Sequence, residues 1–231
     1  MAKVELFCYN RNMNTDKGAE EMLDKYAELV HETNQQFNLT GAKTVEEIRN
    51  THIAESLLVN KYLPEKFDSL VDIGSGAGFP ALVIAINHPH TRVVLIESVG
   101  KKAGFLEKAI LALGLTQARI VEGRVEEIAQ DNVYREKFDV VTARFVAHLN
   151  VLVEYALPLL KVGGIAVFPK PPHETEIKEA EYALKIVGGE IVDIHHEKVS
   201  DSERDIIVIR KIEPTSKEFP RAVGLPEKKP L

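Results

Sequence analysis

The residues best suited to chemistry form one glycine-rich segment in the first half of the chain. It reads Asp72-Ile73-Gly74-Ser75-Gly76-Ala77-Gly78, follows a short β-branched run and precedes a helix-length segment. Glycines in such a loop let the backbone approach a ligand closely and adopt left-handed angles. The spacing G-x-G-x-G, with an acid two residues before the first glycine, departs from the G-x-G-x-x-G fingerprint of dinucleotide binding. A nicotinamide-dependent oxidoreductase is therefore disfavoured.

The same spacing is similar to that of methyltransferases that use S-adenosylmethionine, where the loop passes under the amino-acid and ribose parts of the cofactor. Two later acids fit this interpretation. Glu97 ends the next strand-like run, where a carboxylate can accept hydrogen bonds from both ribose hydroxyls. Val125-Glu126 follows the third run, where an acidic side chain would meet the adenine amino group and a backbone N–H a ring nitrogen.

Motifs that the chain lacks limit the kinds of atom that can accept the methyl group. Methylation of an exocyclic base amine commonly uses an Asx-Pro-Pro-aromatic turn after the fourth strand, and this chain has Thr142-Ala143-Arg144-Phe145 there. Methylation of pyrimidine C5 needs a cysteine nucleophile, and the only cysteine, Cys8, lies in the N-terminal segment. An acceptor with its own lone pair remains, such as a ring nitrogen or the amine of a small molecule. Guanine N7 is unprotonated at neutral pH and needs orientation rather than a general base.

Three arginines are expected at the same edge of the sheet as the loop. Arg124 follows the third strand-like run, Arg144 ends the fourth, and Arg204 lies in the turn before the last. Ligands of open α/β sheets bind at the carboxyl ends of the strands, and guanidinium groups suit phosphates and base edges. Each arginine taken alone is better explained as a solvated surface side chain, and His52, on an apolar helical face, as a packing residue.

The elements that must position these residues alternate along the chain. Runs rich in β-branched residues alternate with helix-length segments, which predicts a parallel α/β sheet with right-handed crossovers. The predicted strands are 69–73, 92–97, 118–121, 138–142 and 165–168, and the predicted helices are 79–88, 99–114, 124–130, 147–160 and 174–187. Two further strands, 190–196 and 205–211, predict a closing antiparallel hairpin at the sheet edge.

Both ends of the chain differ from this alternating pattern. Residues 16–37 carry apolar side chains at helical spacing behind Asp16, a possible N-cap. Thr44 to Glu47 forms a capping box for a second helix that Pro64 ends. The predicted organisation is a helical extension, a cofactor-binding domain and an extended, basic, Pro-rich tail, over residues 1–66, 67–212 and 213–231.

The amino-acid composition limits the classes of protein to which the chain can belong. The 231 residues are 45% hydrophobic and 28% charged, as in ordinary globular proteins. No apolar stretch approaches the ~18 residues of a membrane helix, and no secretory signal is recognisable. The single cysteine excludes an intrachain disulfide and a Cys-based zinc site, so we expect a cytoplasmic protein without a metal. The net charge of −6 argues against bulk attraction to nucleic acid or an anionic membrane, but allows a local basic patch.

Taken in order, the motifs resemble the bacterial 16S rRNA guanine-N7 methyltransferases of the small-subunit methyltransferase G family, formerly called glucose-inhibited division protein B. The resemblance runs from Phe37 to Leu231. It is carried by Asn38-Leu39-Thr40, His52-Ile53-x-Glu55-Ser56, the segment Asp72 to Pro80, Glu97 to Leu106, Gly123 to Glu127, Thr142-Ala143-Arg144 and the tail Phe219 to Leu231.

This resemblance implies a class I methyltransferase fold that transfers methyl from S-adenosylmethionine to guanine N7 in 16S rRNA. The substrate would be the small ribosomal subunit near its decoding region, and the protein is expected to be a monomer. The family's cofactor contacts would fall on Gly74, Phe79, Glu97, Val125, Glu126 and Arg144, which join Asp72, Ser75, Gly76 and Gly78 as candidate cofactor-binding residues. Family residues linked to RNA binding or catalysis would be Asn38, His52, Arg124, Arg144 and Arg204.

The chain departs from the family pattern at three places. Ala81 stands where a second glycine is usual, Lys170-Pro171-Pro172 where Lys-Gly is common, and His148 where arginine is frequent. Two other functions stay open. A small-molecule methyltransferase on the same fold would explain the low basicity, because fold does not fix function. An RNA-binding assembly factor without turnover is the alternative outside the enzymes.

Overall fold

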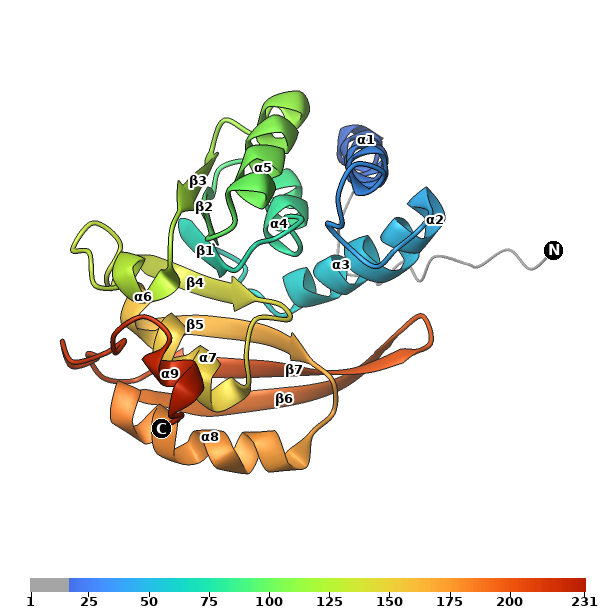
Figure 1. Ribbon diagram of the computed structural model, residues 1–231. Helices are drawn as coiled ribbons and strands as arrows, with labels where there is room; N and C mark the ends of the chain where they lie inside the picture. The colour runs from blue at the N-terminus through green and yellow to red at the C-terminus, as the bar shows by residue number, and fades with distance from the viewer. Residues whose placement is uncertain (1–16) are drawn as a thin grey trace.

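The computed structural model describes residues 17–231, in which a seven-stranded sheet carries helices on both faces (Figure 1). The strands lie in the order β3-β2-β1-β4-β5-β7-β6; the first five in the chain are parallel, and β7 is antiparallel to β5 and β6. Their bounds are β1 Ser69–Ile73, β2 Arg92–Glu97, β3 Ala118–Glu122, β4 Phe138–Ala143, β5 Leu160–Lys170, β6 Gly189–Val199 and β7 Ser202–Lys211. The predicted α/β sheet with its closing hairpin is confirmed.

Two hydrophobic cores lie on opposite faces of this sheet. Because side chains alternate along a strand, Leu70 of β1 belongs to one core and its neighbour Val71 to the other. The first core lies under α1, α3, α4 and α5, and the second under α6, α7 and α8. The helix bounds are α1 Lys17–Asn34, α2 Val45–Glu47, the π-helix η1 Ile48–Ile53, α3 Ala54–Lys61, α4 Ala81–Asn87, α5 Gly100–Leu113, α6 Val125–Ile128, α7 Leu149–Ala156, the 3-10 helix η2 Leu157–Leu159, α8 Glu174–Val187 and α9 Leu225–Lys228.

The N-terminal helices are continuous with the core of the sheet. Tyr26 of α1 and Ile53 of η1 are buried in the same cluster as Leu70 of β1. Thr44 caps α2 as predicted, because its hydroxyl accepts the backbone N–H of Glu47 at 3.1 Å. The predicted boundary at residue 66 stays a prediction, and Cys8 and Asp16 lie outside the described residues. Within the described part of the chain, no helix combines the length and apolar character needed to cross a membrane.

Two predicted element positions were wrong. β5 begins at Leu160 rather than 165, so Gly163 and Gly164 lie inside it, where the register against β4 shifts. Gly163 has φ +87°, an angle that lets a strand bulge without ending. Arg204 lies within β7 opposite Glu197, because the hairpin turn between β6 and β7 is only two residues long.

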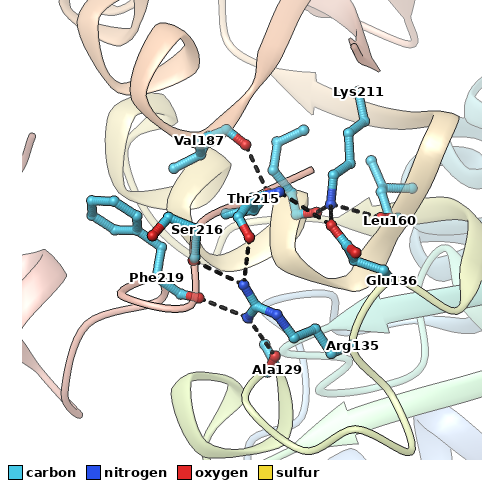
Figure 2. A network of polar contacts seen from close by, with 10 residues as sticks. Ala129, Arg135, Glu136, Leu160, Val187, Lys211, Thr215, Ser216 and Phe219 are labelled. Atoms are coloured by element: carbon cyan, nitrogen blue, oxygen red, sulfur yellow. Dashed lines mark hydrogen bonds and ion pairs between the residues drawn. The ribbon is translucent and has the colours of Figure 1, made fainter. Parts of the chain in front are cut away.

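The C-terminal segment 212–231 does not stay extended; it folds back on the domain and contains α9. Figure 2 shows how Arg135 anchors it, with guanidinium N–H groups donating to the carbonyls of Thr215, Ser216 and Phe219. Beside it, the fully buried Lys211 ammonium donates to Glu136 at 2.6 Å. These contacts are made by single side chains, so they leave no periodic signal in the sequence. For that reason the segment was predicted to be an extended tail, whereas the structure folds it back on the domain.

Replacing Lys211 with methionine is expected to lower the free energy of unfolding by about 3 kcal/mol, because it removes the cation that pairs with a partly buried carboxylate and a donor from two buried carbonyls. Lys211 Nζ donates to Glu136 and to the carbonyls of Leu157 and Leu160 at 2.8 and 2.9 Å. The matched control is Lys161→Met, whose ammonium pairs with Asp139 while 46% exposed, and which should cost less than about 1 kcal/mol. Urea unfolding measures both, and equal losses would contradict the prediction.

Candidate active site

The glycine-rich loop, residues 74–80, joins β1 to α4 and is held by two other elements. Tyr26 of α1 donates a hydrogen bond to the carbonyl of Ala77, and the Ser75 N–H donates to the Ile96 carbonyl of β2 at 3.0 Å. A Cβ on Gly78 would lie 2.7 Å from the Tyr26 hydroxyl, so glycine there is required for packing. Gly74, at φ +63°, is exposed instead. The loop is therefore fixed from behind and presents the Gly74 backbone outward.

Glu97 lies at the end of β2, where the sequence predicts a carboxylate that binds the ribose of the cofactor. Its carboxylate accepts the backbone N–H of Gly76 and that of Val99, each at 2.8 Å, and the residue is buried. A carboxylate has about four acceptor positions, so two remain for further donors. The loop and the end of β2 are thus tied together by the group that can bind two neighbouring hydroxyls.

Asp72, at the end of β1, holds a buried oxygen that lacks a donor. The Thr142 hydroxyl donates to Oδ1 at 2.7 Å, whereas Oδ2 finds no hydrogen-bond partner within residues 17–231. Burial raises the pKa of Asp72 to about 7, although the Thr142 hydrogen bond acts in the opposite direction. A buried acceptor without a donor is rare in proteins and often marks a place where a ligand binds.

These groups fit S-adenosylmethionine. The unpartnered Asp72 oxygen would accept a hydrogen bond from the ammonium in the amino-acid part of the cofactor, and Glu97 would accept from the ribose hydroxyls. The exposed Gly74 backbone would let the cofactor come closest to the loop. Ser75 is buried with its hydroxyl on the Asp72 carbonyl, at 3.2 Å, so its side chain supports the loop rather than facing outward.

The affinity for S-adenosylmethionine is expected to rise with pH up to about 7, by as much as about tenfold per pH unit, and then to level off. Below its pKa of about 7, Asp72 must lose a proton before it can bind an ammonium, and above it the carboxylate is already ionised. Calorimetry between about pH 5.5 and 7.5 measures this change in affinity, because the α-amino group of the cofactor stays protonated in that range. Asp72→Asn should flatten the profile, and a flat wild-type profile would contradict it.

Arg144 follows β4 directly and is the buried centre of a second cluster. Its side chain is only 6% exposed, and Nη1 donates to Glu55 of α3 at 2.8 Å. The guanidinium carbon lies 5.2 Å from the ring centroid of Phe79, in the loop, and 5.2 Å from that of Phe145. Burial lowers the pKa of Arg144, and the Glu55 carboxylate opposes this, so the group stays a cation at neutral pH.

Glu55 joins two of the predicted arginines. Its other oxygen accepts Arg204 Nε of β7 at 2.5 Å, so one buried carboxylate links the ends of β4 and β7 to the N-terminal helices. In the sequence, Glu55 stands out only as part of a family motif, and its role was not predicted. The available signal was its spacing, three residues after His52 on one helix, which places the two side chains on the same face.

His52 lies between Arg144 and Phe79. Its Nδ1 is 3.1 Å from Arg144 Nη2, and its ring stacks on Phe79 with a centroid distance of 5.2 Å. Burial and then the Arg144 charge lower the pKa of His52 to about 4, so the imidazole is neutral at pH 7 and Nδ1 accepts from Arg144. His52 therefore positions Arg144 and is also the packing residue that its apolar helix face indicates.

Lys170, where the chain departs from the family pattern, holds the segment that follows Arg144. Lys170 Nζ donates to the Ala147 carbonyl at 2.8 Å and pairs with Glu176, which accepts the Leu149 N–H at 2.6 Å. His148, between them, has an exposed side chain. Lys170 thus holds this segment in place without the glycine that commonly follows it in the family.

Arg124 does not join the Arg144 cluster. Its side chain is 41% exposed and donates to Glu126 at 3.0 Å. The Glu126 carboxylate also accepts the Gly224 N–H of the C-terminal segment at 2.9 Å and faces the Tyr155 hydroxyl at 3.4 Å. Burial acts to raise the pKa of Glu126, but the Arg124 guanidinium and the Gly224 N–H hold it below its ordinary value. Because its side chain is occupied, the predicted adenine contact stays a prediction for the Val125-Glu126 backbone alone.

Asn38 lies apart from both groups. It is exposed in the turn after α1, and its side chain makes no hydrogen bond to the other residues of 17–231. The turn is instead organised by Asn34, which accepts from the Leu39 and Thr40 N–H groups at 2.9 and 3.0 Å and donates to the Ala42 carbonyl at 2.7 Å. The role predicted for Asn38 stays a prediction, and the contribution of Asn34 was missed.

The strand order, the loop after β1 and the acid at the end of β2 define an S-adenosylmethionine-dependent methyltransferase of class I. Solved structures of this class share the fold at low identity. Geranyl diphosphate C-methyltransferase from Streptomyces coelicolor A3(2) superposes with TM-score 0.57 at 16% identity, covering 74% of this chain and 83% of its own. The B. subtilis M1A22 tRNA methyltransferase TrmK gives 0.56 at 14%, covering 71% and 66%.

Within that class, the chain belongs to the rRNA small subunit methyltransferase G family, whose sequence model matches residues 19–210. Ribosomal RNA small subunit methyltransferase G of Brevibacillus brevis is 40% identical over 215 residues, 91% of this chain and 90% of the relative. The protein of that name from Chloroflexus aggregans is 43% identical over 86% and 84% of the two chains. The predicted family, enzyme class and cofactor are thereby confirmed.

Proposed function

We propose that this protein transfers a methyl group from S-adenosylmethionine to N7 of one guanine in 16S rRNA, as a monomer acting on the small ribosomal subunit in the cytosol. The observation that supports N7 as the acceptor is that the possible bases around Arg144 are already hydrogen-bonded. Glu55 accepts from two arginines, and the His52 lone pair at Nδ1 accepts from Arg144. Neither is free to remove a proton from an exocyclic amine, whereas N7 has no proton to remove.

The residues of this chain orient and exclude water rather than transfer protons. Bound S-adenosylmethionine supplies a methyl group on a sulfonium; the N7 lone pair forms the new C–N bond as the C–S bond breaks, and that electron pair returns to sulfur. Asp72 and Glu97 would hold the donor at the ends of β1 and β2. Arg144, at the end of the adjacent β4, would orient the guanine or its phosphate through its planar guanidinium.

The charge distribution favours a folded ribosomal particle over free RNA. With a net charge of −6, the chain attracts phosphates only where basic residues gather, so shape and local contacts must supply most of the affinity. We therefore expect efficient methylation of small subunits that lack the modification, and poor methylation of a short naked oligonucleotide.

Incubation of such subunits with radiolabelled S-adenosylmethionine, followed by mass mapping of 16S rRNA, tests the proposal. One 7-methylguanine per subunit and 1:1 binding of S-adenosylmethionine, with none of NAD, is the supporting result. Methyl found on an exocyclic amine would exclude N7, and equal methylation of a random RNA duplex would exclude a specific rRNA site. Binding of subunits without methyl transfer would indicate an assembly factor instead of an enzyme.

A further inference from the structure

Phe145, the residue after Arg144, adopts a costly conformation in an exposed position. Its φ is +56°, an angle that bulky side chains rarely adopt, and the residue is 68% exposed. Two other non-glycine residues within 17–231 share a positive φ. Glu136 binds the Lys211 ammonium, and Ser200 lies in the β6–β7 turn, so both have local reasons for their angle. Backbone strain combined with an exposed aromatic ring points to function at Phe145.

Phe145 also lies next to residues of the candidate cofactor site. Its ring centroid is 5.2 Å from the Arg144 guanidinium carbon, and that carbon is equally close to the buried ring of Phe79 in the glycine-rich loop. On the other side of Phe145, Val146 lies against Gly74, since a Cβ on Gly74 would be 2.8 Å from Val146 Cγ2. An aromatic face at the surface is therefore attached directly to the residues that border the cofactor.

We propose that Phe145 is the platform on which the target guanine stacks, an inference that rests on the proposed function. Aromatic side chains stack on unpaired bases in single-stranded RNA, and each such stack contributes about tenfold or more in affinity. As N7 forms its bond to the methyl carbon, the positive charge of the sulfonium passes to the guanine ring. The negative face of an aromatic ring attracts a cation, so Phe145 would stabilise the transition state more than the bound substrate.

Three substitutions at Phe145 separate stacking from shape and strain. Phe145→Leu keeps an apolar side chain and removes the π face, so kcat/KM on small subunits should fall about 10- to 100-fold. Phe145→Tyr keeps the ring and should stay within about threefold. Phe145→Gly relieves the backbone and should raise the unfolding midpoint while slowing transfer. S-adenosylmethionine affinity should change less than about twofold in all three, because the cofactor contacts are unaltered.

The control for these rates is Leu111→Ala on α5, since Leu111 is 84% exposed and away from the site; it should methylate like the wild type. Methylation by Phe145→Leu at the wild-type rate would overturn the proposal. So would equal losses of cofactor affinity in Phe145→Leu and Phe145→Tyr, because that pattern would indicate a cover over Arg144 rather than a base platform.

A fluorescence measurement tests the stack independently of methyl transfer. The chain contains no tryptophan, so Phe145→Trp introduces a single tryptophan at the site, whose emission can be excited apart from that of the tyrosines, and Leu111→Trp a matched exposed one. We expect 7-methylguanosine 5′-monophosphate, with S-adenosylhomocysteine present, to quench the first saturably and more strongly than guanosine 5′-monophosphate, and to affect the second only in proportion to concentration. Equal behaviour of the two variants would overturn the platform. Saturable quenching by a protein that methylates no subunit would support the platform and overturn the proposed function alone.

Discussion

Arg144→Lys is expected to slow single-turnover methyl transfer about 30- to 150-fold, a loss of about 2–3 kcal/mol in transition-state stabilisation. Lysine keeps the charge, but one ammonium cannot reproduce the planar guanidinium that contacts Glu55, His52 and two aromatic rings together. S-adenosylmethionine affinity should stay within a few-fold, since Asp72 and Glu97, the residues proposed to hold the cofactor, are unaltered.

The control is Arg49→Lys. Arg49 also pairs with two carboxylates, those of Glu20 and Asp24, but it lies on the N-terminal helices away from the cofactor loop. It should methylate like the wild type. If Arg144→Lys also stays within about twofold of the wild-type rate with cofactor binding intact, Arg144 forms a structural ion pair only. Its proposed role in orienting the guanine or its phosphate is then wrong.

Gly74→Val is expected to abolish detectable cofactor binding, a loss of about 100-fold or more in affinity. Gly74 has φ +63° and presents open backbone, and any Cβ there would lie 2.8 Å from Val146 Cγ2. A β-branched side chain would therefore fill the surface on which the cofactor approaches the loop and displace the segment that follows Arg144. Isothermal titration with S-adenosylmethionine measures the effect.

Gly114→Val separates this effect from strain. Gly114 ends α5 at φ +67°, nearly the same angle, and a Cβ there would meet nothing within 4 Å. Both variants should lose about 1–3 kcal/mol of stability from the left-handed backbone, but only Gly74→Val should lose the cofactor. Wild-type affinity in a folded Gly74→Val protein would contradict the prediction.

The sequence by itself determined the architecture and the cofactor loop. Apolar runs that alternate with helix-length segments indicate a parallel sheet with crossovers, because a strand covered on both faces is mostly apolar. All five residues of β1 are buried, and Leu70, Val71 and Ile73 among them are apolar. The spacing of Asp72, Gly74 and Gly76 identifies the loop for a similar reason. A tight turn between a strand and a helix is a local structure, so neighbouring residues encode it.

What local patterns did not show was the length of β5 and the path of the tail. Two glycines inside β5 look like a boundary, and only the pairing with β4 makes them a bulge. The tail is held by Arg135, a single side chain that donates to the backbone carbonyls of Thr215, Ser216 and Phe219. A periodic pattern reports burial, not individual hydrogen bonds, so neither feature was predictable from spacing.

The tertiary structure alone decided which polar groups form the site. Glu55, Arg144 and Arg204 come from α3, the end of β4 and β7, and one carboxylate brings the two guanidinium groups together. Arg124, which the sequence placed with them, pairs with Glu126 beside the C-terminal segment. A strand end fixes where a side chain begins, but the partner that it reaches depends on segments far apart in the chain. The charge of His52 is decided in the same way, because burial beside Arg144 lowers its pKa.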